Sequence, residues 1–356
     1  MRLLTKISIG AALLLASATA PTEACTRATF IGDSARHVIT GRTLDWRTPI
    51  PTNLYVMPQG VKRSSFDVPS QSIDWVSKYG SVVSVGYDVG TSEGMNEKGL
   101  VCSLLYLPGS QYTRDNETRK AMSSSLWAQY ILDNFATTQE ALDVIKQDLF
   151  YVNAPAMPDG SVTCLHMAIT DATGYTAIIE YIKGDLSIHE GYQYQVLTNA
   201  PPYDQQLAVN EYWETVGGMH MLPGTNRSYD RFARASFYIH AIPKNSDHQT
   251  ALAGVFGVIG NCAVPTGISV EGQPEISTTQ WRSVSDQTDR TYYFKLTLRP
   301  SIVWVDLREF LLTPGSPIMK LDLTDSKREI TGDAIKHMKP SKGYTPMYRV
   351  DPNFKL

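Results

Sequence analysis

The sequence predicts an α+β fold in which antiparallel sheets are covered by helices. Stretches rich in strand-forming residues come in blocks, and these blocks alternate with pairs of helical stretches. The chain lacks the strict strand–helix–strand rhythm that is typical of a parallel sheet. No internal repeat or flexible linker interrupts it. We therefore expect a single domain over residues 25–356, preceded by a removable segment over residues 1–24.

Residues 1–24 have the three parts of a secretory signal peptide. Arg2 and Lys6 give a positive start, residues 7–20 are mainly apolar, and small residues occupy positions −3 and −1 before Cys25. The apolar stretch is shorter than the roughly 20 residues that span a bilayer. We expect a mature protein that is periplasmic or secreted, is soluble, and has no stable membrane insertion.

Cys25 would become the first residue of the mature chain. It would then carry a thiol nucleophile together with an α-amine, whose reference pKa of about 7.7–8.0 suits it to accept the thiol proton. A cut after Ala20 would leave a proline first, which signal peptidases usually reject, and a cut after Ala18 would leave six residues for self-processing. Two other fates stay open. Lipid attachment is disfavoured by Thr22 and Glu23 just upstream, and a buried or disulfide-bonded cysteine is the plain alternative.

Composition narrows the class of protein. The chain is 42% apolar and 19% charged, as is ordinary for a globular protein, and its formal net charge of −3 gives no reason to expect nucleic acid as a partner. Setting Cys25 aside, three cysteines remain, so a complete disulfide framework is not expected. The chain has no CxxC, HExxH or glycine-rich phosphate loop, and its seven histidines lack ligand spacing. We expect neither a metal nor a cofactor.

The first half of the mature chain begins with strands and continues with helices. Residues 26–31 and 37–44 predict a hairpin around a Gly-Asp-Ser turn, so Cys25 would open a strand. Further strands are expected at 81–85 and, after a turn at 96–99, at 100–105. Helices are expected at 122–135 and at 141–149, the latter behind a capping-box pattern at 137–140.

The second half repeats this alternation. Strands are expected at 162–169, 175–182 and 194–198, with a turn at 171–174. Helices are expected at 205–216, 230–242 and 249–259. The last strands are expected at 279–285, 291–298 and 302–307, before an irregular tail that contains proline.

Five short motifs follow one another along the mature chain. They are Cys25-Thr26, Gly-Arg-Thr-Leu-Asp at 41–45, Gly-Met-Asn-Glu-Lys-Gly-Leu at 94–100, Leu-Thr-Asn-Ala-Pro at 197–201, and Leu-Pro-Gly at 222–224 with Arg231-Phe232. In this order they resemble the choloylglycine hydrolase and penicillin V acylase family of N-terminal nucleophile amidases. The resemblance runs from Cys25 to about residue 300. It implies an αββα sandwich, two antiparallel sheets between helical layers.

The resemblance also implies how the reaction is started. Cys25 would be the nucleophile and its own amine the proton acceptor. Asp45 would hold the amine by a charge-assisted hydrogen bond, and Arg42 would lower the thiol pKa and bind the carbonyl end of the substrate. Each residue also has a purely structural interpretation. Asp45 could be a carboxylate in a turn, and Arg42 could form a salt bridge on the surface.

Three further positions are assigned by the same resemblance. The side-chain amide of Asn199 and the backbone N–H of Tyr106 would bind the oxyanion. Arg231 would lie near the nucleophile and tune its charge. The alternative interpretation of Asn199 is an ordinary turn residue, and that of Arg231 is an arginine on a helix surface. Arg227 and Arg234 lie close by in the sequence, so either could occupy this place instead of Arg231.

Tyr106 and Trp46 bear on the substrate. Family members that hydrolyse bile salts tend to have asparagine where this chain has Tyr106, and penicillin V acylases tend to have tyrosine. Trp46 could wall an apolar acyl pocket or belong to the core. The resemblance therefore favours penicillin V acylase activity on a small amide with an apolar acyl group. The exported branch of the family adds N-acyl homoserine lactone deacylation.

Other functions stay open at this point. Bile-salt hydrolysis is the nearest alternative, and the family also implies a homotetramer. A non-catalytic binding protein, periplasmic or lipid-tethered, would keep the scaffold without turnover. A protease of the Cys-His kind would need a histidine close to Cys25.

Overall fold

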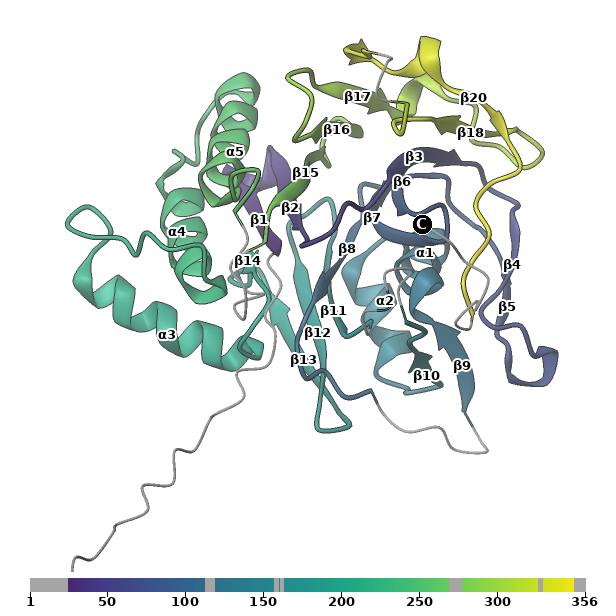
Figure 1. The fold of residues 1–356 in the computed structure, drawn as a ribbon, viewed down its shortest axis with the longest axis horizontal. Helices are drawn as coiled ribbons and strands as arrows, with labels where there is room; N and C mark the ends of the chain where they lie inside the picture. Colours follow the sequence, from purple (N-terminus) through teal and green to yellow (C-terminus); the bar gives the residue numbers. More distant parts are fainter. Residues whose placement is uncertain are drawn as a thin grey trace, which may run out of the picture.

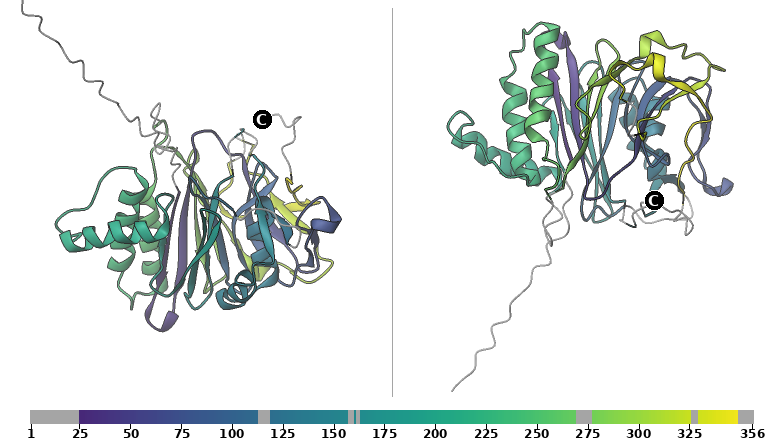
Figure 2. Two further views of the ribbon diagram at one scale, coloured as in Figure 1. Left: turned by 90° about the horizontal axis from the view of Figure 1, so that it is seen from below. Right: turned by 45° about the horizontal axis from the view of Figure 1, so that its top comes forward.

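The computed structural model describes residues 25–112, 119–156, 160, 163–268, 277–325 and 329–348. These residues form four layers, with two sheets stacked face to face and helices on both outer faces (Figure 1 and Figure 2). The expected α+β fold, an αββα sandwich, is confirmed. Within the described part of the chain, no helix is both long enough and apolar enough to cross a bilayer.

The first sheet contains Cys25 and, in the described residues, has seven strands in the order β14-β1-β2-β15-β16-β17-β19. Their bounds are β1 Cys25–Ile31, β2 Val38–Asp45, β14 Val196–Leu197, β15 Thr279–Asp286, β16 Thr291–Leu296, β17 Val303–Asp306 and β19 Gly332–Asp333. The pairs are antiparallel apart from β17 with β19. The predicted N-terminal hairpin is confirmed, with Cys25 opposite Leu44.

The second sheet has nine described strands in the order β13-β12-β11-β8-β7-β6-β3-β18-β20. Their bounds are β3 Thr52–Met57, β6 Ser81–Gly86, β7 Gly90–Asn96, β8 Val101–Tyr106, β11 Leu165–Thr170, β12 Thr176–Ile182, β13 Asp185–Gly191, β18 Ile318–Leu321 and β20 Lys339–Ser341. Two small pairs lie beside it, β4 Lys62–Ser64 with β5 Asp74–Val76, and β9 Lys120–Ser123 with β10 Phe150–Asn153.

The helices separate into two layers according to the sheet that they cover. α1 Ser124–Asn134 and α2 Thr138–Ile145 lie on the second sheet. α4 Ser228–Ala241 and α5 His248–Cys262 lie on the first sheet, and α3 Tyr203–Val216 packs on α4 (Figure 1). The capping box is present in altered form. The Thr137 hydroxyl accepts from the N–H of Glu140 at 3.2 Å, while the Glu140 carboxylate accepts from the N–H of Ala136 at 2.7 Å.

Several boundaries differ from the sequence prediction. The helix expected at 122–135 begins at Ser124 because residues 120–123 pair in parallel with β10. The next helix ends at Ile145 because Asp148 has a positive φ of 48° and the chain then enters β10. Residue 162 of the strand expected at 162–169 lies outside the described residues, and β11 begins at Leu165.

The tail that we expected to be irregular contributes strands to the second sheet. β18 pairs with β3 and with β20, so the prediction for this segment was wrong. Pro340 lies within β20, at the edge of the sheet, where a residue without an N–H is tolerated. The strands β3, β7 and β13 were also missed.

Close packing of α5 on β2 fixes the hairpin that carries Cys25. Gly41 lies where a methyl group would be 2.4 Å from Cγ1 of Ile259 and 2.8 Å from Cγ1 of Val255. Only a residue without a side chain lets the helix approach the strand this closely. The position of Cys25 therefore depends on a contact on the opposite face of its sheet.

Gly41→Ala should lower the free energy of unfolding by about 1–3 kcal/mol, because the core is overpacked at that point. Gly257→Ala is the matched control on the exposed side of α5, where an added methyl group meets no atom within 4 Å. It should raise the free energy of unfolding by roughly 0.5–1 kcal/mol through helix propensity. Urea unfolding measures both, and equal effects of the two substitutions would contradict the packing argument.

Candidate active site

Cys25 is buried at the start of β1, with only 3% of the residue exposed, and it lines a pocket between the layers. The register of the hairpin brings Arg42 and Asp45, both on β2, to the same end of the sheet. Asp45 is in turn opposite Thr279 on β15. The first motif and the second motif of the sequence thus meet because they occupy neighbouring strands.

Both backbone ends of Cys25 are held by buried side chains. The Cys25 N–H donates to Oδ1 of Asn199, and Nη1 of Arg231 donates to the Cys25 carbonyl at 2.6 Å. Nη2 of Arg231 also donates to Asn199 Oδ1 at 3.1 Å, and Nδ2 of Asn199 donates to the Tyr106 carbonyl at 2.6 Å. These partners, two donors on the oxygen and one acceptor on the nitrogen, fix the orientation of the Asn199 amide.

Asp45 is a buried carboxylate next to Cys25. Thr43 donates its hydroxyl to Oδ2 of Asp45 at 3.1 Å, and Thr279 donates to Oδ1 at 2.5 Å. Burial raises the pKa of Asp45 to about 7, although nearby Arg231 and the two threonine hydroxyls favour the charged form. The carboxyl group is therefore poised to change its charge near neutral pH.

Arg42 connects the two sheets at the site. Nη1 donates to the Ser92 carbonyl at 2.7 Å and lies 3.7 Å from the Glu93 carboxylate, and Nη2 donates to the Leu104 carbonyl. Only 1% of Arg42 is exposed, which rules out the surface salt bridge considered above. Burial raises the pKa of the Cys25 thiol, and the positive charge of Arg42 opposes that rise.

The pocket next to Cys25 has a volume of about 100 Å³. Its wall is formed mainly by apolar and small hydroxyl residues, namely Leu44, Trp46, Ile50, Gly86, Tyr87, Val89, Gly90, Thr91, Ser92, Leu104, Tyr106, Ser124, Ser125, Pro155, Thr163, Leu165 and Met347, together with Cys25 and Arg42. Trp46 and Tyr106 meet edge to face, with ring centroids 5.4 Å apart. Trp46 lies in this wall, whereas Asp45, Asn199 and Arg231 are buried and do not line the pocket.

The structure resolves the choice among the three arginines of α4 and its start. Arg231 contacts Cys25, whereas Arg234 donates to the carbonyls of Pro223 and Thr225, both at 2.7 Å. Arg227 donates to the Tyr229 hydroxyl instead. The arginine that the sequence singled out is therefore the one at the site.

Some supporting residues were missed. The Ser228 hydroxyl accepts from the N–H of Asn199 at 2.9 Å, and Gln206 donates to the Asn199 carbonyl at 3.0 Å. Thr43 lies inside the second motif, two residues before Asp45, so its contact with Asp45 could have been predicted from the sequence. The contact of Thr279 with Asp45 could not, because Thr279 reaches Asp45 only through strand pairing across the sheet.

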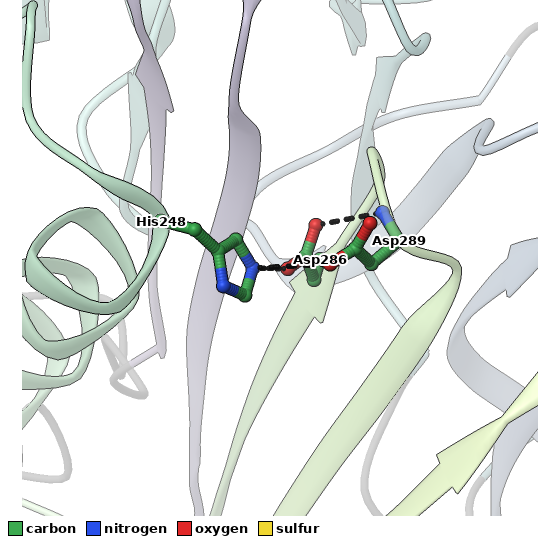
Figure 3. A group of neighbouring side chains, drawn as sticks. All are labelled: His248, Asp286 and Asp289. Carbon is green, nitrogen blue, oxygen red and sulfur yellow. Dashed lines mark hydrogen bonds and ion pairs between the residues drawn. The ribbon is translucent and has the colours of Figure 1, made fainter.

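One histidine belongs to a cluster of potential metal ligands far from these motifs in the sequence. Ligand atoms of His248, Asp286 and Asp289 all lie within 4.8 Å of one another (Figure 3). His248 bonds through Nε2 to Oδ2 of Asp286, whose Oδ1 accepts the N–H groups of Thr288 at 3.1 Å and Asp289 at 3.0 Å. These contacts fasten the start of α5 to the turn between β15 and β16, and we assign no metal to them.

The comparisons with known proteins agree with the motifs. A family model described as linear amide C–N hydrolases, choloylglycine hydrolase family, matches residues 25–329. The chain belongs to this family. Its matched region begins at Cys25, the residue around which the site is built.

Two members of the family are similar over nearly their full length. This chain is 38% identical to the penicillin V acylase of Pectobacterium atrosepticum, over 96% of this chain and 94% of that protein. It is 44% identical to the solved penicillin V acylase of Agrobacterium tumefaciens, with a TM-score of 0.85 over 91% of this chain and 99% of that one. The chain is therefore a penicillin V acylase-like hydrolase of linear amides.

Bile-salt enzymes are also among the relatives of this family member. A bile salt hydrolase/transferase of Clostridium perfringens is 26% identical over 61% of this chain and 73% of that protein. A solved conjugated bile acid hydrolase variant from the same organism is 23% identical, with a TM-score of 0.71 over 84% of this chain and 97% of that one, and shows the shared fold.

The raised pKa of Asp45 predicts how the free energy of unfolding depends on pH. The prediction applies to a chain that is not cut before Cys25, in which the Cys25 nitrogen is still an uncharged amide. Because the folded-state pKa of about 7 exceeds the unfolded value of about 3.9, folding favours the protonated acid, and this stabilisation is lost as pH rises from about 4 to 7. The free energy of unfolding of the Asp45→Asn variant should therefore increase, relative to that of the parent chain, as the pH is raised from 5 to 8. Urea unfolding at both pH values measures this, and a difference that does not change with pH would contradict it.

Proposed function

We propose that this chain is an exported penicillin V acylase that uses Cys25 as an N-terminal nucleophile and also deacylates N-acyl homoserine lactones. One observation carries the proposal. The buried thiol of Cys25 lines an apolar pocket, while Asn199 and Arg231 hold the two backbone ends of the same residue. The two penicillin V acylases described above support the choice of substrate.

The proposed reaction begins when removal of residues 1–24 turns the Cys25 nitrogen into an α-amine. The amine takes the thiol proton, the sulfur attacks the amide carbonyl carbon, and the carbonyl oxygen becomes an oxyanion. The C–N bond then breaks as the ammonium returns a proton to the leaving nitrogen. Water adds to the resulting thioester, the C–S bond breaks, and the carboxylic acid leaves while the thiol is restored.

The charged neighbours of Cys25 have distinct roles in this scheme. An ammonium at Cys25 would face Asp45, which would orient the amine toward the sulfur. Arg42 would favour the thiolate against the effect of burial. Arg231, bonded to the Cys25 carbonyl, would fix the residue and add a second positive charge nearby.

The oxyanion would be bound by Asn199 and the backbone of Tyr106. Nδ2 of Asn199 donates one of its two hydrogens to the Tyr106 carbonyl, and its second hydrogen could be donated to the oxyanion. The N–H and C=O of one strand residue point to the same side, so the Tyr106 N–H faces the side on which Asn199 lies. Two such donors at one place are what an oxyanion hole requires.

The acyl group would occupy the pocket beyond Cys25. Its wall is mainly apolar, and the edge-to-face pair of Trp46 and Tyr106 suits an aromatic acyl group such as phenoxyacetyl. Bile-salt hydrolysis is the second candidate, favoured by the relatives that carry that activity in their names. We also propose a periplasmic or secreted location, from the signal-peptide pattern of residues 1–24, and a homotetramer, from the family resemblance.

Cys25→Ser should slow the hydrolysis of penicillin V by more than about 10³-fold, because the hydroxyl is far harder to ionise than the thiol. Cys164→Ser is the matched control, since this half-buried thiol does not line the pocket. Release of 6-aminopenicillanic acid measures both variants. A Cys25→Ser enzyme with a near-normal rate would remove Cys25 from the mechanism.

Asp45→Asn should lower kcat far more than it raises KM, because the amine would lose its orienting charge while the acyl pocket is unchanged. Intact mass is the control, since it shows whether the variant still begins at Cys25. A correctly processed variant with an altered KM alone would make Asp45 a substrate-binding residue.

The experiment that tests the function as a whole starts with the exported protein. Its intact mass and N-terminal sequence should show an unmodified chain beginning at Cys25, and that protein should cleave penicillin V and N-acyl homoserine lactones faster than conjugated bile salts. A lipid-modified or extended N-terminus would contradict the mechanism, and binding without turnover would favour the non-catalytic alternative. In the described part of the chain, no histidine lines the pocket, so replacing histidines should leave activity intact, unlike in a Cys-His protease.

A further inference from the structure

The C-terminal part of the chain returns to the pocket after completing the second sheet. We call residues 344–348 the strap. In Figure 1 the strap lies beyond β20, where the chain, drawn in yellow, runs back toward the α1 layer. The family match ends at residue 329, so the strap lies outside the region that defines the family. One of its residues, Met347, nevertheless lines the same pocket as Cys25.

Hydrogen bonds fasten the strap to two elements of the pocket wall. On the turn between β6 and β7, the N–H groups of Thr345 and Met347 donate to the carbonyls of Asp88 and Val89, both at 3.3 Å. At the start of α1, the hydroxyls of Ser123 and Ser125 both donate to the Met347 carbonyl, at 2.6 Å and 3.0 Å. The backbone of Met347 is thus held from both sides.

A buried tyrosine anchors the strap at its beginning. The Tyr344 hydroxyl lies 2.7 Å from the Thr91 hydroxyl on β7, and only 8% of the residue is exposed. Its guanidinium neighbour Arg63 stacks over the ring at 5.8 Å. This anchor does not itself line the pocket, so it bears on the pocket through the placement of Met347 and through its partner Thr91, which lies in the wall.

The side chain of Met347 is what the strap offers to a bound molecule. Both backbone polar groups of Met347 are engaged, so its contribution to the pocket wall is the thioether chain. Met347 is half-buried, and a methionine adapts its shape to its neighbours more readily than branched residues do. Cys25 belongs to the first sheet, whereas the strap is tied to α1 on the far side of the second sheet, so the two residues enter the pocket wall from different layers.

We propose that Met347 determines the length of the acyl group that the pocket accepts. This inference rests on the proposed function, because it takes the group held between Cys25 and Met347 to be the acyl part of an amide. Short and aromatic acyl groups would fit against the thioether. Longer straight chains would have to displace it. The strap is then a specificity element that lies beyond the region matched by the family model.

The test is a series of N-acyl homoserine lactones of increasing chain length, with penicillin V as the aromatic member. Met347→Ala should raise the kcat/KM ratio of long to short acyl chains by about 10-fold or more, since one methylene in an apolar pocket is worth about 10–200-fold. Met347→Trp should lower that ratio by a similar factor. Met319→Ala is the matched control, because this methionine on β18 is also half-buried but does not line the pocket.

Tyr344→Phe tests whether the strap positions Met347. Loss of the contact with Thr91 should shift the same ratio in the direction of Met347→Ala by a smaller factor, while a purely structural role would change the melting temperature and leave the ratio alone. Ratios that stay within about twofold of the parent enzyme in both Met347 variants would overturn the inference.

A readout without turnover separates this inference from the proposed function. Binding of phenoxyacetate and of decanoate to the Cys25→Ala protein should show the same reversal of preference when Met347 is replaced by Ala or by Trp. If the parent enzyme cleaves none of the amides but binding preference still depends on Met347, the proposed activity fails and the pocket assignment holds. If the amides are cleaved and neither readout depends on Met347, only the inference on Met347 fails.

Discussion

The site depends on the way in which Asn199 and Arg231 hold the first residue of β1. A strand end is normally a place where the backbone frays, because its polar groups lack partners on one side. Here the N–H and the C=O of Cys25 are both bonded to fully buried side chains, and those two side chains are bonded to each other. The first residue of the strand thereby has buried partners for both of its backbone polar groups.

Holding Cys25 in this way requires charges in the core. Arg42, Asp45 and Arg231 are all buried, and moving an ion out of water costs several kcal/mol unless partners replace the lost hydration. In this structure the lost hydration is replaced mainly by neutral groups. Backbone carbonyls accept hydrogen bonds from both arginines, and threonine hydroxyls donate to Asp45. The carboxyl group nevertheless keeps a pKa raised to about 7, so compensation is incomplete at that position. Such incomplete compensation is typical of functional sites.

Part of this arrangement could be predicted from the sequence, because it depends on local pattern. The hairpin that brings Arg42 and Asp45 to Cys25 follows from β-rich residues around a short turn, and the motif order identified the family. Thr279 and Ser228 could not be found in this way, since each reaches the site through pairing or packing between segments far apart in the chain. The strand β7 was missed for a related reason. Its sequence, rich in glycine and polar residues, is placed in the centre of the second sheet by its neighbours and by α1.

Removal of residues 1–24, as proposed, would alter the electrostatics that the fold has set up. Before cleavage the Cys25 nitrogen is a neutral amide with one hydrogen, which it gives to Asn199. A freed ammonium has three hydrogens and a positive charge, so it can keep that bond and also face Asp45. Its charge would pull the pKa of Asp45 down from its raised value, and the ionised carboxylate would in turn favour the ammonium. The two groups would then titrate as a pair. The charge of Asp45, which is only partly compensated before cleavage, would be neutralised by the ammonium in the mature chain.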